Sequence, residues 1–112
     1  DGKTPHEMIF KGAPLLDWEM DIAWVIRGGA DPIKLIKKYA GNITAAHIKD
    51  IAPKGKNADE DGWADVGHGT VDWKPIMAAL KKTRVRHFVL EHDKPSNTKR
   101  FAERSFVAAS KL

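Results

Sequence analysis

The 112-residue sequence contains no cysteine, which excludes disulfide bonds, thiolate catalysis and zinc sites of the cysteine type. It also lacks any apolar run near the ~20 residues that a membrane-spanning helix needs. No basic segment followed by an apolar one marks a signal peptide. Because 42% of the residues are hydrophobic and 30% are charged, we expect a soluble protein with no membrane partner. The sequence does not identify the compartment, and a cytoplasmic location is only favoured over a periplasmic one.

Strong segregation of charge is also absent. The formal net charge is +4 and the sequence pI is about 9.4, but lysines and arginines alternate with carboxylates along most of the chain. The one basic run, KKTRVR at residues 81–86, falls where a helix is expected to end. That position favours a solvated helix end that complements the helix dipole over a phosphate or nucleic-acid patch. We therefore expect no nucleic-acid partner.

Helix and strand signals alternate along a single domain, residues 1–112. Asp31 followed by Pro32 is a typical helix start, and Gly41 a typical stop. Residues 1–14 are predicted to be a loop with one helical turn, and residues 52–70 a long loop that could act as a lid. The pattern predicts a strand running into a loop at 15–26, a helix at 31–40, a strand at 43–48, a helix at 72–82, a strand at 87–90 and a helix at 98–111.

This strand–helix alternation predicts an α/β fold with a parallel sheet and right-handed crossovers. Three parallel strands make a poor protein by themselves, because their outer edges would expose unpaired backbone groups and their faces would expose apolar surface. We therefore expect the chain to gain strands from elsewhere, either as part of something larger or by self-association as a homo-oligomer.

Each predicted strand ends in a side chain that can bind a metal: Asp21, His47 and Glu91. The carboxyl ends of parallel strands meet at one edge of a sheet, so these groups are expected to converge. Oxygen and imidazole donors suit Mn²⁺, Mg²⁺, Co²⁺ or Zn²⁺. Taken singly, Asp21 fits a helix cap or surface charge, and His47 a structural histidine. Their common position at three strand ends favours a metal site.

The segments WEMDIAWVIRGGADP, HIKD, DVGHGTVDW and VLEHD occur in this order. With their spacing, they resemble the sugar phosphate isomerase/epimerase family of the xylose-isomerase-like TIM barrels. The resemblance covers residues from about Leu15 to Leu112. It implies a parallel βαβαβα arrangement that forms the last three βα units of an eight-stranded TIM barrel, and thus a C-terminal, partial barrel.

The resemblance also implies a metal centre and a reaction. Family members hold the metal with Glu, Asp, His and Glu on the last four strands, and Asp21, His47 and Glu91 match the second, third and fourth of these. The chemistry is proton transfer next to a carbonyl through an enediolate, carried out by two glutamates. Glu91 matches one catalytic glutamate. The other has no counterpart in this sequence, so the chain alone is expected to lack half of the acid–base pair.

Four further residues are predicted to contact the substrate, and three of them have a structural alternative. Trp24 could face the sugar or only pack at a strand end. Lys49 could bind a hydroxyl or phosphate, or form ion pairs at the barrel rim. Trp63 could close over a sugar ring from the long loop. His68 stands between two glycines, where relatives often carry Glu, and is either a pocket residue or a tolerated loop side chain.

The leading hypothesis is a metal-dependent sugar (phosphate) isomerase or epimerase that acts on a small carbohydrate. The alternative is a non-catalytic partial-barrel fragment or binding module with the same fold. A metal-dependent endonuclease is less favoured, because it needs more histidine and aspartate ligands and a continuous basic groove.

Overall fold

The computed structural model describes residues 2–112. Within this range no helix is both long and apolar enough to cross a membrane. The fold is mixed α/β, as predicted. In chain order its elements are α1 (Pro5–Gly12), β1 (Trp18–Asp21), α2 (Ile22–Arg27), α3 (Pro32–Lys38), β2 (Ile43–Ile48), β3 (Asp50–Ile51), the 3₁₀ turn η1 (Ala58–Glu60), β4 (Trp63–Ala64), α4 (Trp73–Leu80), β5 (His87–Leu90) and α5 (Thr98–Ala109).

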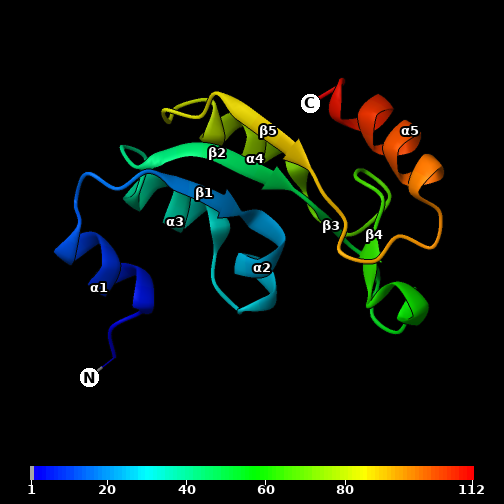
Figure 1. Cartoon of the computed structure of the whole chain (residues 1–112), viewed down its shortest axis with the longest axis horizontal. Coiled ribbons are helices and arrows are strands. Elements are labelled where there is room, and N and C mark those ends of the chain that lie inside the picture. The colour runs from blue at the N-terminus through cyan, green and yellow to red at the C-terminus, as the bar shows by residue number, and fades with distance from the viewer. Residues whose placement is uncertain (1) are drawn as a thin grey trace.

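The central feature is a parallel sheet with the strand order β1-β2-β5 (Figure 1). In its register, Asp21 of β1 lies beside His47 of β2, and His47 lies beside Val89 of β5. Glu91 follows β5 directly. The register therefore brings the three predicted metal-binding residues to the same end of the sheet. The predicted parallel strands are confirmed.

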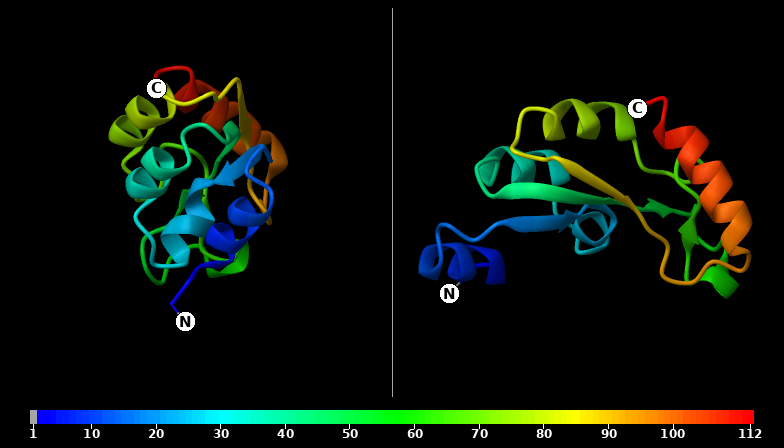
Figure 2. Two further views of the ribbon diagram at one scale, coloured as in Figure 1. Left: turned by 90° about the vertical axis from the view of Figure 1, so that its left-hand side faces the viewer. Right: turned by 45° about the horizontal axis from the view of Figure 1, so that its top comes forward.

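Helices α3 and α4 pack together behind the sheet, and the opposite face is open in the described part of the chain (Figures 1 and 2). The strands alternate accordingly. Met20 and Ala46 point to the helices and are fully buried, whereas Glu19 and His47 belong to the other face and remain partly exposed. Parallel sheets are normally covered on both faces. The open face is thus the unusual surface of this molecule.

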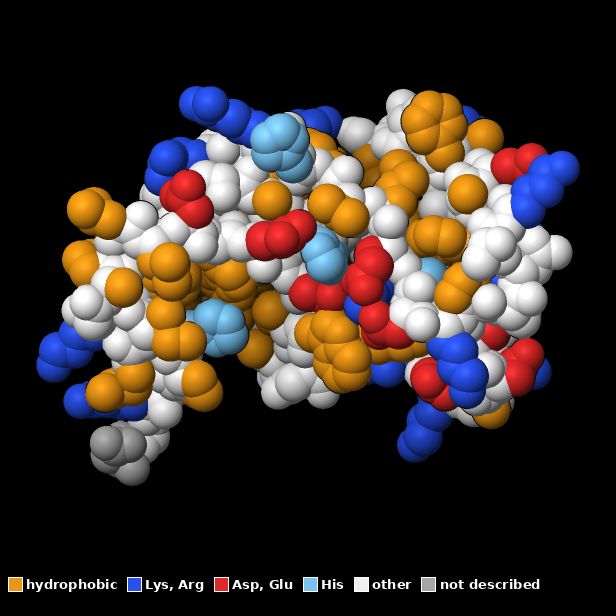
Figure 3. Space-filling view, viewed as in Figure 1, with side chains coloured by type: hydrophobic (Ala, Val, Ile, Leu, Met, Phe, Trp, Pro, Cys, Tyr) orange, Lys and Arg blue, Asp and Glu red, His pale blue; other side chains and the backbone are white. Residues whose placement is uncertain are grey.

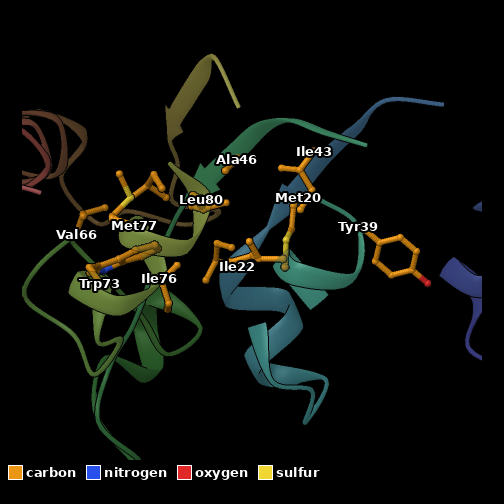
Figure 4. Close-up of a cluster of buried hydrophobic side chains, with 12 residues drawn as sticks. Met20, Ile22, Tyr39, Ile43, Ala46, Val66, Trp73, Ile76, Met77 and Leu80 are labelled. Atoms are coloured by element: carbon orange, nitrogen blue, oxygen red, sulfur yellow. The ribbon is translucent and has the colours of Figure 1, made fainter. Parts of the chain in front are cut away.

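The hydrophobic core lies between the sheet and these helices. It extends from the first two strands to α4 and the segment that precedes α4 (Figure 4). Phe10 of α1 makes aromatic contacts with Trp18, at the start of β1, and with Tyr39, just after α3. These contacts attach α1 to the core. The buried residues of this core are Met20, Ile22, Ile36, Tyr39, Ile43, Ala46, Ile48, Val66, Trp73, Ile76, Met77 and Leu80.

Two segments near the N-terminus are more helical than predicted. Residues 5–12 form a complete helix instead of one turn, because Thr4 and Glu7 make a capping box at its start. The segment Ile22–Arg27 is helix α2, so the prediction that the first strand runs on into a loop is wrong. The carboxylate of Asp21 accepts a hydrogen bond from the Trp24 amide at 2.9 Å and begins this helix.

The segment 52–70 is also more ordered than predicted. Strand β4 pairs antiparallel with β3, and η1 lies between them. Trp63, Ala64 and Val66 are buried. The expectation of a loop without regular structure is therefore wrong for residues 63–66, which belong to the packed interior, whereas residues 53–59 are exposed and a role as a lid stays a prediction for them.

Buried ion pairs attach α5 to this segment. Arg100 of α5 contacts Glu60 at 2.7 Å and Asp65 at 3.0 Å, and Arg104 contacts Asp65 at 3.2 Å. The two carboxylates are almost fully shielded from solvent, and the arginine side chains lie over them. The last helix is thus held to the long connection as well as to β5.

Candidate metal centre

Asp21, His47 and Glu91 converge at the carboxyl end of the sheet. Each offers one donor atom, and these atoms lie within 4.8 Å of one another. Figure 3 shows acidic and histidine side chains gathered near the middle of the open face. The grouping follows from the register, because Asp21 and His47 are cross-strand partners and Glu91 follows the neighbouring strand. It is the arrangement that the positions of the three residues at their strand ends predict.

The two ring nitrogens of His47 face different carboxylates. Nδ1 lies 2.9 Å from Oε2 of Glu91 and 3.5 Å from Oδ2 of Asp21. Nε2 lies 3.0 Å from Oε1 of Glu19. Burial by itself would lower the pKa of His47, but hydrogen bonding and charge from Glu91, followed by Glu19, outweigh it and raise the pKa. Nδ1 is the nitrogen that belongs to the cluster.

Asp21 serves the fold and the site at the same time. Its Oδ1 caps α2 through the Trp24 amide, and its Oδ2 faces His47 and Lys49. The helix cap fixes the carboxylate, so Oδ2 is held toward the cluster without loss of the capping interaction. The structural and the metal-binding interpretations of Asp21 are therefore compatible.

Lys49 places a buried ammonium beside the cluster. Its side chain is 1% exposed, and Nζ lies 2.8 Å from Glu91, 3.0 Å from Asp93 and 3.2 Å from Asp21. Desolvation opposes this charge, but the hydrogen bonds that Lys49 donates to Glu91 and Asp93, together with the charge of Asp21, prevail and raise the pKa of Lys49. Burial by itself would raise the pKa of Asp93, but the hydrogen bond with Lys49, followed by the one with Glu91, outweighs burial and lowers the pKa. A positive charge is thus the natural occupant of this region.

The donor set suits a divalent cation. One imidazole nitrogen and two carboxylate oxygens fit Mn²⁺, Mg²⁺, Co²⁺ or Zn²⁺, and the three donors leave coordination positions open. Asp21, His47 and Glu91 would hold the ion, and Lys49 would have to share its carboxylates with it.

Of the predicted substrate-binding residues, Trp24 has the most suitable position. It follows Asp21 by one helical turn, and 53% of it is exposed. Its ring lies 5.6 Å from Nζ of Lys49, and it lines a groove together with Glu19 and Asp21. The exposed indole is thus an apolar surface beside the cluster, and its contact with a substrate stays a prediction.

Lys49 and Trp63 lie inside the protein. The Lys49 ammonium is enclosed by carboxylates, so it does not offer a free charge to a phosphate. Trp63 is 1% exposed; the Arg27 guanidinium stacks 3.2 Å from its ring centroid, and Trp24 packs against it edge-on. The ring is therefore part of the packing beneath Arg27 and Trp24. Because it is buried, the prediction that Trp63 closes over a sugar ring is wrong.

His68 lies away from the cluster. It is exposed and lines a groove along α5 with Gly67, Arg104 and Val107. Within residues 2–112 it makes no hydrogen bond to the metal-binding group. Its place favours the interpretation as a tolerated loop side chain.

Sequence reasoning missed Glu19 as a member of the site. The signal is present in the sequence, because Glu19 precedes Asp21 by two residues and so belongs to the same face of β1. Asp93 also belongs to the surroundings of the site, since it follows Glu91 by two residues and contacts Lys49.

Comparisons of the chain with models of protein families, with curated proteins and with solved structures gave no match.

Proposed function

We propose that this chain is the C-terminal portion of a xylose-isomerase-like TIM barrel and carries part of the centre of a metal-dependent sugar (phosphate) isomerase or epimerase. The observation that supports this most is the convergence of Asp21, His47 and Glu91, from three neighbouring parallel strands, at one sheet edge. Ligands at the carboxyl ends of barrel strands are the usual construction of such active sites.

The one-sided sheet also supports a barrel origin. In a TIM barrel the helices cover the outer face, and the inner face lines the barrel interior. Here α3 and α4 lie on one face, while Glu19, Asp21 and His47 belong to the open one. Within the described residues, β1 and β5 each pair with β2 only, so the outer edge of each strand could pair with a further parallel strand. Those strands would come from a longer polypeptide or from a second copy.

In the proposed reaction, the chain's own residues bind the substrate and move one proton. A divalent metal, when bound, supplies polarisation of the substrate's carbonyl and neighbouring hydroxyl oxygens. Glu91 takes the proton from the carbon next to the carbonyl, which leaves the substrate as an enediolate and Glu91 as the protonated acid, and Glu91 returns a proton to that carbon in the reverse step. Its contacts with His47 and Lys49 both use Oε2, which leaves Oε1 for the substrate. Trp24 packs against the sugar's apolar face.

Metal titration tests the site directly. Mn²⁺ or Co²⁺ is titrated by calorimetry into the wild-type chain and into D21A, H47A and the exposed control D59N. We expect binding in the wild type and in D59N, and loss of binding in the two cluster variants. A wild-type chain that binds neither ion would contradict the metal centre and favour the alternative, a non-catalytic partial-barrel module.

Solvent exchange tests the chemistry with a single glutamate. The Mn²⁺-loaded chain is incubated with aldoses and ketoses, free and phosphorylated, in deuterium oxide, and NMR follows deuterium incorporation next to the carbonyl. One base is enough to exchange this proton, so the half-site should be active toward its substrate and E91Q should not. Metal binding without exchange for any sugar would contradict the isomerase or epimerase function but not the metal site.

A further inference from the structure

Glu19 is the only carboxylate in residues 2–112 that contacts Nε2 of His47. The two atoms, Oε1 and Nε2, are 3.0 Å apart. On the opposite side of the ring, Nδ1 faces Glu91 and Asp21. A neutral imidazole has one protonated and one free nitrogen, and only the free one can bind a metal. The partner of Nε2 therefore decides whether Nδ1 is available.

The register explains why Glu19 reaches this nitrogen. Glu19 is paired with Ala45, one layer of side chains below the pair Asp21–His47. It thus approaches the imidazole from the side away from Glu91, which lies beyond the end of β5. Ala45 precedes His47 by two residues in β2, so its small side chain belongs to the same face as the His47 ring.

Neither the cluster nor the fold accounts for Glu19 otherwise. It is not among the residues, within 2–112, whose donor atoms group around a possible ion. Its side chain is 54% exposed, so Glu19 is not part of the core, and the hydrogen bond to His47 is the one that its side chain makes in the described chain. The placement is what a residue that orients a metal-binding histidine needs.

We propose that Glu19 is a positioning residue: it accepts the Nε2–H of His47, fixes the tautomer in which Nδ1 is free, and directs Nδ1 to a divalent cation held with Asp21 and Glu91. Carboxylates commonly play this part behind metal-binding histidines, and their loss typically weakens metal affinity about 10- to 100-fold. The proposal rests on the metal site of the proposed function.

The first test compares Zn²⁺ and Mn²⁺ affinities of the wild type, E19A, E19Q and the control E103Q. Glu103 is exposed on α5, and its ion-pair partner within residues 2–112 is Lys99. We expect E19A to lose about 10- to 100-fold in affinity, and E19Q to lose less, because its amide oxygen still accepts the Nε2–H. E103Q should match the wild type, and thermal unfolding should show all four folded. Wild-type affinity in E19A would overturn the proposal.

The second test reads the nitrogens themselves. In nitrogen-15 NMR spectra of the Zn²⁺-loaded wild type, we expect His47 to keep its proton on Nε2 and to bind through Nδ1. Binding through Nε2 would overturn the proposal. If the wild type binds no metal, the proposed function fails separately. The metal-free spectra, recorded above the raised pKa of His47, then show whether E19A has a smaller Nε2–H fraction than the wild type, and an unchanged fraction refutes the role of Glu19.

Discussion

Nζ of Lys49 lies 2.8 Å from Oε2 of Glu91, the same oxygen that contacts Nδ1 of His47 at 2.9 Å. The ammonium also contacts Asp21 and Asp93, and its side chain is almost fully buried. Three carboxylates so close together would repel one another without a cation. Lys49 is therefore an internal counterion that keeps the carboxylates in place before any metal binds, and it shares two of them with the candidate metal centre.

Replacing Lys49 by methionine should destabilise the metal-free chain and increase its response to metal. Removing one partner of a buried charge group leaves the others uncompensated, and the partial exposure of the carboxylates reduces the cost to about 2 to 4 kcal/mol. A divalent ion would restore the missing charge. The rise in Tm on adding Mn²⁺, measured by circular dichroism, should thus be larger in K49M than in the wild type.

The matched control is K94M, because Lys94 pairs with Asp61 at the surface, where both side chains are more than half exposed. This exposed pair should contribute at most about 1 kcal/mol. Equal Tm values for K49M and the wild type, with and without Mn²⁺, would show that Lys49 does not neutralise the cluster.

The three metal-binding candidates at the strand ends could be predicted from the sequence, because local rules determine where strands end. Strand ends are marked by the change from apolar to charged residues, and parallel strands share one edge, so the meeting of Asp21, His47 and Glu91 could be foreseen. The inward path of Lys49 could not, since a long side chain after a strand can turn to solvent or to the interior. Its direction depends on where the carboxylates of two other strands stand.

The segment 52–70 resisted prediction for a similar reason. It has few apolar residues in sequence, but distant groups give it order: Arg27 stacks on Trp63, and Arg100 of α5 pairs with Glu60 and Asp65. None of these contacts is visible in a local pattern. Helix α2 was missed although Asp21 fits a helix cap, because the aromatic and branched residues that follow Asp21 are typical of a strand.

The ion pair between Glu60 and Arg100 should make the free energy of unfolding depend on pH. Hydrogen bonds from Ser96, followed by Arg100, lower the pKa of Glu60 from 4.5 to about 2. Because the pKa is lower in the folded state, the ionised carboxylate stabilises the fold above pH 4.5, and this contribution is lost as the pH falls toward 2. E60Q should therefore be less stable than the wild type at neutral pH by about 2 to 3 kcal/mol, and the difference should shrink on acidification.

Urea unfolding of E60Q and the wild type at a series of pH values measures this difference. E103Q is the control. Glu103 is an exposed residue of α5, the helix that carries Arg100, and within residues 2–112 its ion-pair partner is Lys99. Its stability should follow the wild type at every pH. A difference between E60Q and the wild type that stays constant from neutral pH to about pH 3 would contradict the role of the Glu60 charge.

Asp50, next to Lys49, should be the most sensitive carboxylate for folding. It is fully buried and accepts four hydrogen bonds: Oδ1 from the Ile51 and Val71 amides, and Oδ2 from the Gly67 amide and Trp73 Nε1. In D50N an NH₂ group replaces one oxygen and faces two donors. We expect a loss of about 2 to 4 kcal/mol in the free energy of unfolding, measured in urea, and a shifted indole N–H resonance of Trp73. The exposed D59N should change neither quantity, and a D50N chain as stable as D59N would mean that these four bonds do not hold the connection between β2 and α4.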